Sequence, residues 1–273
     1  GDTNVVLDIA EYLKAHPGYE VHLAAGPVPE NEVDLTYLVH ERAIPFTAIP
    51  SLVNRINPTT NLKAVLELRK VIVEGQYDIV HTHCSVAGVV GRMAAALARV
   101  PVVVHHIHGW GVQEDMSNTV KGIYLTLEKC CALVTDRLVA VSKPTIDKGL
   151  AYGICPEKKF ALIYNGIPLE KFRKQVDEAA MRQTLGLAAD SKLVGMIARL
   201  DKQKNPLDFI RAAALVVKEY KNVQFLIAGH GVLRSDCEAL IQELQLQEHF
   251  FLLGFRSDID KIMPILDITV MSS

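Results

Sequence analysis

The sequence has 273 residues, of which 49% are hydrophobic and 22% are charged, so it can bury more than one core and suits two α/β domains. Its formal net charge of -2, without a block of like charges, gives no electrostatic reason to expect nucleic acid or an anionic bilayer as a partner. The five cysteines are odd in number and contain no C-x-x-C pair, which indicates reduced thiols in a cytosolic protein.

Short β-branched runs alternate with longer helical patterns along the whole chain, which is typical of parallel sheets with crossover helices. A first helix is expected from the start signal Asp2-Thr3-Asn4 to about Ala15. Further helices are expected at Asn61–Val73, Val86–Ala98, Asn118–Leu133 and Pro144–Ala151. In the first of these, helical spacing relates Leu62, Val65, Leu66, Ile72 and Val73, interrupted by Arg69. Strands are expected at Glu20–Ala24, Ile44–Ile49, Asp78–His83, Val102–His106, Arg137–Val141 and Phe160–Tyr164.

A second unit of the same kind follows Asn165-Gly166-Ile167-Pro168, where Asn, Gly and Pro break the strand. Its expected strands are Leu193–Ala198, Gln224–Ala228, Phe250–Leu253 and Ile268–Met271, and its expected helices are Pro206–Tyr220, Val232–Leu244 and Asp258–Leu266. The predicted fold class is α/β, with two Rossmann-like, doubly wound parallel-sheet domains at residues 1–166 and 167–273. We expect the first to lack its opening strand and the second its C-terminal part.

Histidines gather at the ends of two neighbouring predicted strands. His81 and His83 end one strand, and His105, His106 and His108 end the next. Because side chains alternate along a strand, His106 and His108 share one face and His105 takes the other. Three interpretations stay open: hydrogen bonds to nearby backbone, a metal site, and contact of one imidazole with a polar ligand. No H-E-x-x-H motif and no carboxylate between residues 105 and 111 accompanies them, so the metal site is the weaker interpretation and no metal ligand is assigned.

A cationic turn follows the first strand of the second domain. In open parallel sheets ligands bind beyond the carboxyl ends of the strands, and here Arg199 and Lys204 lie between such a strand and a helix that begins at Pro206. The guanidinium offers a planar fork, the amine offers a point charge, and the helix directs its positive end nearby, which together suit a diphosphate. The simpler interpretation is a solvated turn.

Two glycine turns follow other strands of this domain, at Gly229-His230-Gly231 and at Gly254-Phe255. Glycine permits the backbone to approach a ligand closely, although both turns could equally be tight connections to the next helix. The sequence has no G-x-x-x-x-G-K and no complete G-x-G-x-x-G followed by an acidic residue, which disfavours an ATPase or a dehydrogenase.

Nine strings lie in register over essentially the whole chain: Gly1-Asp2-Thr3-Asn4, Asp78-Ile79-Val80-His81-Thr82-His83, Val104-His105-His106-Ile107-His108-Gly109, Val139-Ala140-Val141-Ser142, Tyr164-Asn165-Gly166-Ile167, Ala198-Arg199-Leu200 with Lys204-Asn205-Pro206, Ile227-Ala228-Gly229-His230-Gly231, Leu253-Gly254-Phe255 and Asp267-Ile268. Together they resemble the family 4 glycosyltransferases, which are retaining enzymes of GT-B fold. The resemblance implies transfer of a sugar from a nucleotide-sugar donor, by preference a UDP-sugar, to an acceptor hydroxyl with retention of configuration.

By the same resemblance, Arg199 and Lys204 neutralise the donor diphosphate in place of a metal ion, and His108 holds the donor sugar near its anomeric carbon. His83 and His106 are candidates on the acceptor side. The donor-binding candidates that the resemblance implies are Gly1, Asn165, Gly229, Gly231, Gly254 and Phe255. No cofactor is implied beyond the nucleotide-sugar itself.

The resemblance also implies a glycan or lipid-linked acceptor, a cytoplasmic location that extends to the inner face of the plasma membrane, and a role in polysaccharide or lipid-linked glycan synthesis. It leads us to expect a pair of glutamates beyond Ser273 and no activity from the 273 residues alone. Pro168 stands where the family commonly has Asp, and His230 replaces a more usual Asp, which bears on donor preference. A GT-B nucleotide-sugar epimerase and a non-catalytic nucleotide-binding fragment are the alternatives.

Overall fold

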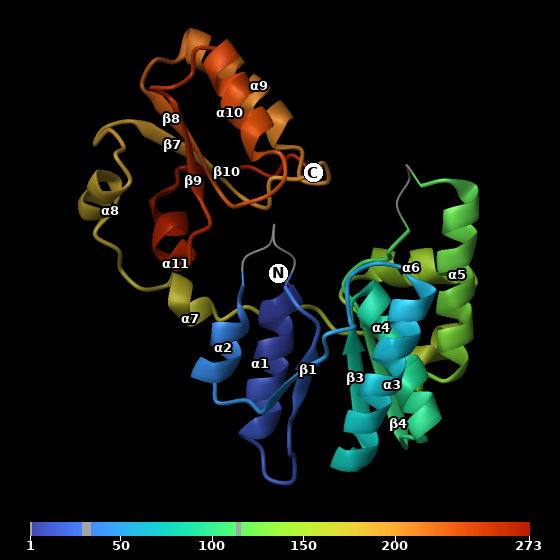
Figure 1. Ribbon diagram of the computed structural model, residues 1–273. Helices are drawn as coiled ribbons and strands as arrows, with labels where there is room; N and C mark the ends of the chain where they lie inside the picture. The colour runs from blue at the N-terminus through green and yellow to red at the C-terminus, as the bar shows by residue number, and fades with distance from the viewer. Residues whose placement is uncertain (1, 29–33, 113–115) are drawn as a thin grey trace. The chain divides into compact units, whose positions relative to one another are not determined.

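The structure, a computed structural model, describes residues 2–28, 34–112 and 116–273 (Figure 1). Contacts divide the chain into two compact units. Among the described residues, the first comprises residues 2–27, 34–112 and 116–166, and the second comprises residues 167–273 together with Val28. No helix within the described ranges is both long enough and apolar enough to span a membrane.

Strands and helices alternate through the first unit. Its helices are α1 (Asp2–Lys14), α2 (Thr36–Glu41), α3 (Pro58–Gly75), α4 (Ser85–Ala98), α5 (Asn118–Leu133), α6 (Lys143–Ala151) and the short 3-10 helix η1 (Glu157–Lys159). Its strands are β1 (Leu23–Ala25), β2 (Phe46–Ala48), β3 (Ile79–His83), β4 (Val102–Ile107), β5 (Arg137–Ala140) and β6 (Phe160–Leu162). All pairings between these strands are parallel.

The strands of the first unit form two sheets, with the orders β1-β2 and β3-β4-β5-β6. Sequence periodicity predicts where strands lie but not which strands pair, and the division into two sheets could not be predicted from it. A side chain connects the two sheets. The ring of His22, just before β1, hydrogen-bonds Thr47 Oγ1 of β2 at 2.8 Å and the hydroxyl of Tyr77, just before β3.

Helices α3 and α4 pack against each other, and α4 also packs on β3 and β4. The apolar face of α3 differs from the one that the spacing of Leu62, Leu66 and Val73 indicates, because these three side chains are exposed. The buried face consists of Ala64, Val65, Leu68 and Ile72, which join Ile49, Val90 and Val103 in the core. The helix was predicted correctly, but three of the five apolar residues in its expected stripe face solvent.

The second unit contains one sheet of four parallel strands, in the order β10-β7-β8-β9. The strands are β7 (Lys192–Ile197), β8 (Val223–Ala228), β9 (Phe250–Gly254) and β10 (Ile268–Thr269). The helices are α7 (Leu169–Phe172), α8 (Glu178–Thr184), α9 (Pro206–Glu219), α10 (Arg234–Glu243), α11 (Ile259–Ile262) and the 3-10 helix η2 (Met263–Ile265).

Alternate side chains of these strands enter cores on opposite faces of the sheet, as a doubly wound fold requires. Met196 and Ile227 pack with Phe209 and Ile210 of α9 on one face. Leu193 and Leu226 pack on the other face with the segment that includes Ile262 and Ile265, and with the partly buried Met181 of α8. The strands β7 and β8 are therefore covered on both sides and read as continuous apolar runs.

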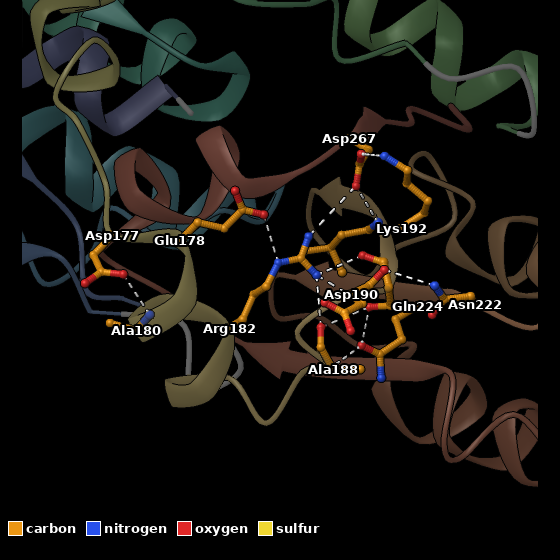
Figure 2. Close-up of polar contacts among 12 residues, drawn as sticks. Asp177, Glu178, Ala180, Arg182, Ala188, Asp190, Lys192, Asn222, Gln224 and Asp267 are labelled. Carbon is orange, nitrogen blue, oxygen red and sulfur yellow. Dashed lines mark hydrogen bonds and ion pairs between the residues drawn. The ribbon is translucent and has the colours of Figure 1, made fainter.

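One buried arginine fastens α8 to the sheet (Figure 2). Arg182 donates to the carbonyl oxygens of Ala188 and Ser191 at 3.1 and 2.9 Å and pairs with Glu178 on its own helix. Its other terminal nitrogen lies 3.9 Å from the carboxylate of Asp267, which precedes β10. Asp267 in turn accepts the backbone N–H of Leu193 at 2.8 Å, so one cluster of charges joins α8, β7 and β10.

Candidate functional site

The loops that leave β7, β8 and β9 are bonded to one another at the carboxyl edge of the sheet in the second unit. The N–H of Leu200 donates to the carbonyl of His230 at 3.0 Å, and the N–H of Leu233 donates back to the carbonyl of Leu200 at 3.0 Å. The N–H of Gly229 donates to the carbonyl of Gly254 at 2.8 Å. The sequence candidates Arg199, Gly229, Gly231 and Gly254 are therefore brought to one edge, which is where ligands bind in open parallel sheets.

Close backbone contact explains two of these glycines. A Cβ on Gly229 would lie 1.8 Å from the carbonyl oxygen of Ala198, and one on Gly231 would lie 2.4 Å from that of Leu200. Only glycine fits at such distances, so both residues have a structural reason to be glycine in the absence of any ligand. The structure thus favours tight connections at this turn and leaves the donor-binding role of Gly229 and Gly231 as a proposal.

The cationic turn is held by its own carboxylate. Asp201 accepts the backbone N–H of Lys204 at 3.0 Å and lies 3.2 Å from a guanidinium nitrogen of Arg199, whose side chain is 68% exposed. No ion pair found among the described residues involves the amine of Lys204. The two cations thus leave the same short turn, and the exposed guanidinium can exchange the partly buried carboxylate of Asp201 for another anion.

The end of this turn is held by a residue that follows β10, the edge strand next to β7. The hydroxyl of Ser272, beyond β10, donates to the carbonyl oxygens of Lys204 and Asn205, at 2.9 Å in both cases. Asn205 adopts a left-handed conformation at φ 48°, and α9 begins at the buried Pro206 as the sequence predicts. The positive end of the α9 dipole therefore lies beside the turn that carries Arg199 and Lys204.

The remaining donor-side candidates make none of the backbone hydrogen bonds described above between the loops after β7, β8 and β9. Phe255 follows β9 directly and is 47% exposed, beside Gly254 with its positive φ of 71°. Asn165 is exposed, in the stretch after β6 that has no regular structure. Gly1 lies outside the described residues.

Four histidines form a second cluster, at the carboxyl ends of β3 and β4 in the first unit. His83 pairs with His106 across the two strands, and His81 and His108 extend the cluster along them. The rings of His106 and His108 stack with centroids 4.5 Å apart, and His83 Nδ1 lies 3.0 Å from His108 Nε2. The candidates His83, His106 and His108 are thus brought together.

His105 takes the opposite face, as strand alternation predicts. It hydrogen-bonds Thr82 at 2.9 Å and packs against Gly88 of α4, where a Cβ would lie 2.4 Å from its ring. Since this histidine is enclosed by the core of the first unit, its role is structural. The other four histidines are separated from it by the sheet.

Burial sets the charge of the histidine cluster. Loss of hydration lowers the pKa of His81 to about 4, with a smaller contribution from His108. The same effect, followed by repulsion from its histidine neighbours, lowers the pKa of His83 to about 2. Both imidazoles are therefore neutral at neutral pH and can accept as well as donate hydrogen bonds.

Sequence reasoning missed two residues that shape the cationic turn. The spacing of Asp201 from Arg199 and Lys204 could have indicated a local carboxylate cap, because Asp commonly accepts the N–H of a residue two or three positions later. Ser272 carried no such signal, since it is far from the turn in sequence and reaches it only because β10 pairs with β7.

The chain belongs to the glycosyltransferases of family 4. Residues 1–171 match the family described as "Glycosyltransferase Family 4", and residues 177–273 match "Glycosyl transferases group 1". These two matches cover both units, and the parallel α/β architecture is that of GT-B glycosyltransferases.

One relative in Escherichia coli is 34% identical over 82% of this chain, and it is a UDP-Gal:alpha-D-GlcNAc-diphosphoundecaprenol alpha-1,3-galactosyltransferase. The chain spans 59% of that enzyme's length. The crystal structure of Anabaena HepE in complex with UDP and glucose is similar over 100% of this chain and 71% of its own, with a TM-score of 0.81 and 22% identity. A UDP-GlcNAc 2-epimerase from Neisseria meningitidis bound to UDP-GlcNAc is similar over 100% of this chain and 75% of its own, with a TM-score of 0.69 and 16% identity.

Proposed function

We propose that the protein transfers a sugar from a UDP-sugar to an acceptor hydroxyl with retention of anomeric configuration. The observation that carries this proposal is the turn at the carboxyl edge of β7, where Arg199 and Lys204 lie beside the N-terminus of α9. The activity of the Escherichia coli relative supports a UDP-sugar donor and a lipid-diphosphate-linked glycan acceptor. The UDP and glucose bound by Anabaena HepE are in keeping with this donor class.

The chemistry assigned to the cationic turn follows from where charge develops. As the bond between the sugar and the diphosphate breaks, negative charge accumulates on the leaving phosphate. Fixed cations that meet this charge stabilise the transition state more than the bound donor, and only such differential binding accelerates the reaction. We assign this role to the guanidinium of Arg199, the amine of Lys204 and the N–H groups at the start of α9. A divalent ion on the diphosphate is then not required.

In the same proposal His108 contacts the donor sugar, and His83 and His106 lie on the acceptor side. The hydrogen bond between His83 Nδ1 and His108 Nε2 orients both rings. Asn165, Gly229, Gly231, Gly254 and Phe255 are assigned to the donor. A peripheral association with the cytoplasmic face of the membrane would bring a lipid-linked acceptor within reach.

The cationic turn is tested by Arg199→Ala and Lys204→Ala in the full-length enzyme with a labelled UDP-sugar and acceptor. We expect kcat to fall by about 100-fold to 1000-fold, as for other preorganised charge donors, while circular dichroism stays unchanged. Lys202→Ala is the matched control. Lys202 is exposed on the same turn, so its substitution removes the same charge, and the proposal gives Lys202 no role in donor binding. Equal turnover in all three variants and the wild type would refute the assignment.

The nature of the reaction needs a separate measurement, because the similarity to the Neisseria meningitidis epimerase shows the fold alone. A transferase consumes donor only in step with acceptor, whereas an epimerase acts on the donor without acceptor. NMR of the product gives the anomeric configuration, and an inverted linkage would contradict retention. A non-catalytic fragment predicts UDP binding without turnover under either condition.

A further inference from the structure

The histidine cluster of the first unit brings three ring nitrogens together from two strands. His81, His83 and His106 each offer one nitrogen, and these nitrogens all lie within 4.8 Å of one another. The arrangement follows from strand register, since His83 lies opposite His106 and His81 is two residues earlier on the same face of β3. Two nitrogens on one tetrahedral zinc ion lie roughly 3.4 Å apart, so small side-chain rotations would close the group around an ion.

The burial of the cluster suits a metal ion, because an imidazole nitrogen that is shielded from water can turn its lone pair to an ion. The Nε2 atom of His81 is buried and has no hydrogen-bond partner among the described residues. A buried polar atom without a partner is rare and calls for a specific explanation, such as an ion.

A neighbouring ring supplies the support that metal-ligating histidines have. In metal sites the second ring nitrogen of a histidine ligand is held by an outer hydrogen-bond partner, which fixes the tautomer and the ring orientation. His83 has such a partner, because its Nδ1 lies 3.0 Å from His108 Nε2 and its Nε2 is left for an ion. The absence of a nearby carboxylate, which argued against a metal from sequence, does not exclude a site made of imidazoles alone.

We propose that His81, His83 and His106 form a binding site for a divalent transition-metal ion, with Zn²⁺ as the best fit, in which His108 acts as the positioning residue for His83. Three imidazoles leave a fourth tetrahedral position open, and a site without carboxylates disfavours Mg²⁺ and Ca²⁺. The proposed ion would share His83 and His106 with the acceptor side of the proposed transfer reaction, but nothing in that reaction assigns a metal ion to these residues, so the site goes beyond it.

The test titrates Zn²⁺ into the metal-free protein, without an affinity tag, in competition with a chromophoric chelator. We expect one tightly bound Zn²⁺ per chain, loss of this binding in His81→Gln and His83→Gln, and a 10-fold to 100-fold weaker affinity in His108→Gln. His40→Gln is the matched control, since His40 is an exposed histidine on α2 of the same unit. It should bind as the wild type does.

A second readout does not depend on the variants folding. Co²⁺ added to the metal-free wild-type protein should give the intense visible absorption of a tetrahedral site, and Zn²⁺ should remove that absorption. The proposal is overturned by weak octahedral Co²⁺ spectra, by the absence of stoichiometric Zn²⁺ binding, or by equal binding in folded His81→Gln and His83→Gln. None of these measurements requires turnover, so the proposal and the transfer reaction fail or succeed separately.

Discussion

Gly229 lies where the chain leaves β8, and its single missing Cβ determines how closely this turn approaches the one after β7. Gly229→Ala would place a carbon 1.8 Å from the carbonyl oxygen of Ala198, so the two turns must move apart. We expect a loss of about 1–3 kcal/mol in the free energy of unfolding of the second unit, measured by urea denaturation. The same shift should weaken binding of UDP if this edge holds the donor.

The control is Gly122→Ala on α5, where a Cβ meets no atom within 4 Å. Alanine is the better helix former by roughly 0.5–1 kcal/mol, so this variant should be slightly more stable than the wild type. A Gly229→Ala protein as stable as wild type would show that the two turns are free to separate.

For single residues, the sequence was sufficient to predict on which face of a strand a side chain lies. It was not sufficient to predict contacts between residues on neighbouring strands. Alternation along β4 correctly separates His105 from His106 and His108. The contact between His83 and His108 depends on the register of β3 and β4, which no local pattern specifies. The role of Ser272 likewise depends on β10 pairing next to β7, a strand order that periodicity does not encode.

At the scale of elements, the short strand β10 relies on Asp267, whose carboxylate accepts from Lys192 and from the N–H of Leu193 (Figure 2). These hydrogen bonds lower the pKa of Asp267 below its ordinary value of 3.8. Because the folded pKa is the lower one, the unfolded chain takes up the proton first as the pH falls. The stabilisation is complete above about pH 3.8 and is lost as the pH falls through the folded pKa.

Urea unfolding of the wild type and of Asp267→Asn tests this at a series of pH values from neutral to strongly acidic. The variant should be less stable at neutral pH, and the difference between the two proteins should shrink below about pH 4. Asp190→Asn controls for the loss of one negative charge, since Asp190 contributes to this cluster only through its backbone carbonyl. If the difference in unfolding free energy between the two proteins stayed constant across the pH series, protonation of Asp267 would not contribute to the loss of stability in acid.

Long, strongly patterned helices could be located from sequence, whereas two of the short helices could not. The helix expected at Asn118–Leu133 has those bounds in the structure, and α9 begins at the expected Pro206. Helices α2 and α8 were missed, because a helix of six or seven residues offers too few turns for periodicity to appear. Helix α8 is instead held by the tertiary contacts of Arg182, which leave no local signal.

At the scale of the whole molecule, the reactivity of the five cysteines can be used to probe burial in both units. Cys84 and Cys130 are exposed, Cys155 is partly buried, and Cys131 and Cys237 are buried. Burial raises the pKa of the Cys131 and Cys155 thiols and raises that of Cys237 to about 11. Since the thiolate is the nucleophile, both shielding and the raised pKa slow the reaction of the buried cysteines.

A short pulse of iodoacetamide on the native protein should therefore label Cys84 and Cys130 first and Cys155 more slowly. Cys131 and Cys237 should react only after urea unfolds the unit that contains each of them. Peptide mass spectrometry follows every site, and fragment ions separate Cys130 from Cys131. This adjacent pair on α5 is an internal control, because the two thiols share one sequence context and differ in burial. If Cys237 were labelled in the native protein as fast as Cys84, the core between α9, α10 and the sheet would not be closed as the structure describes.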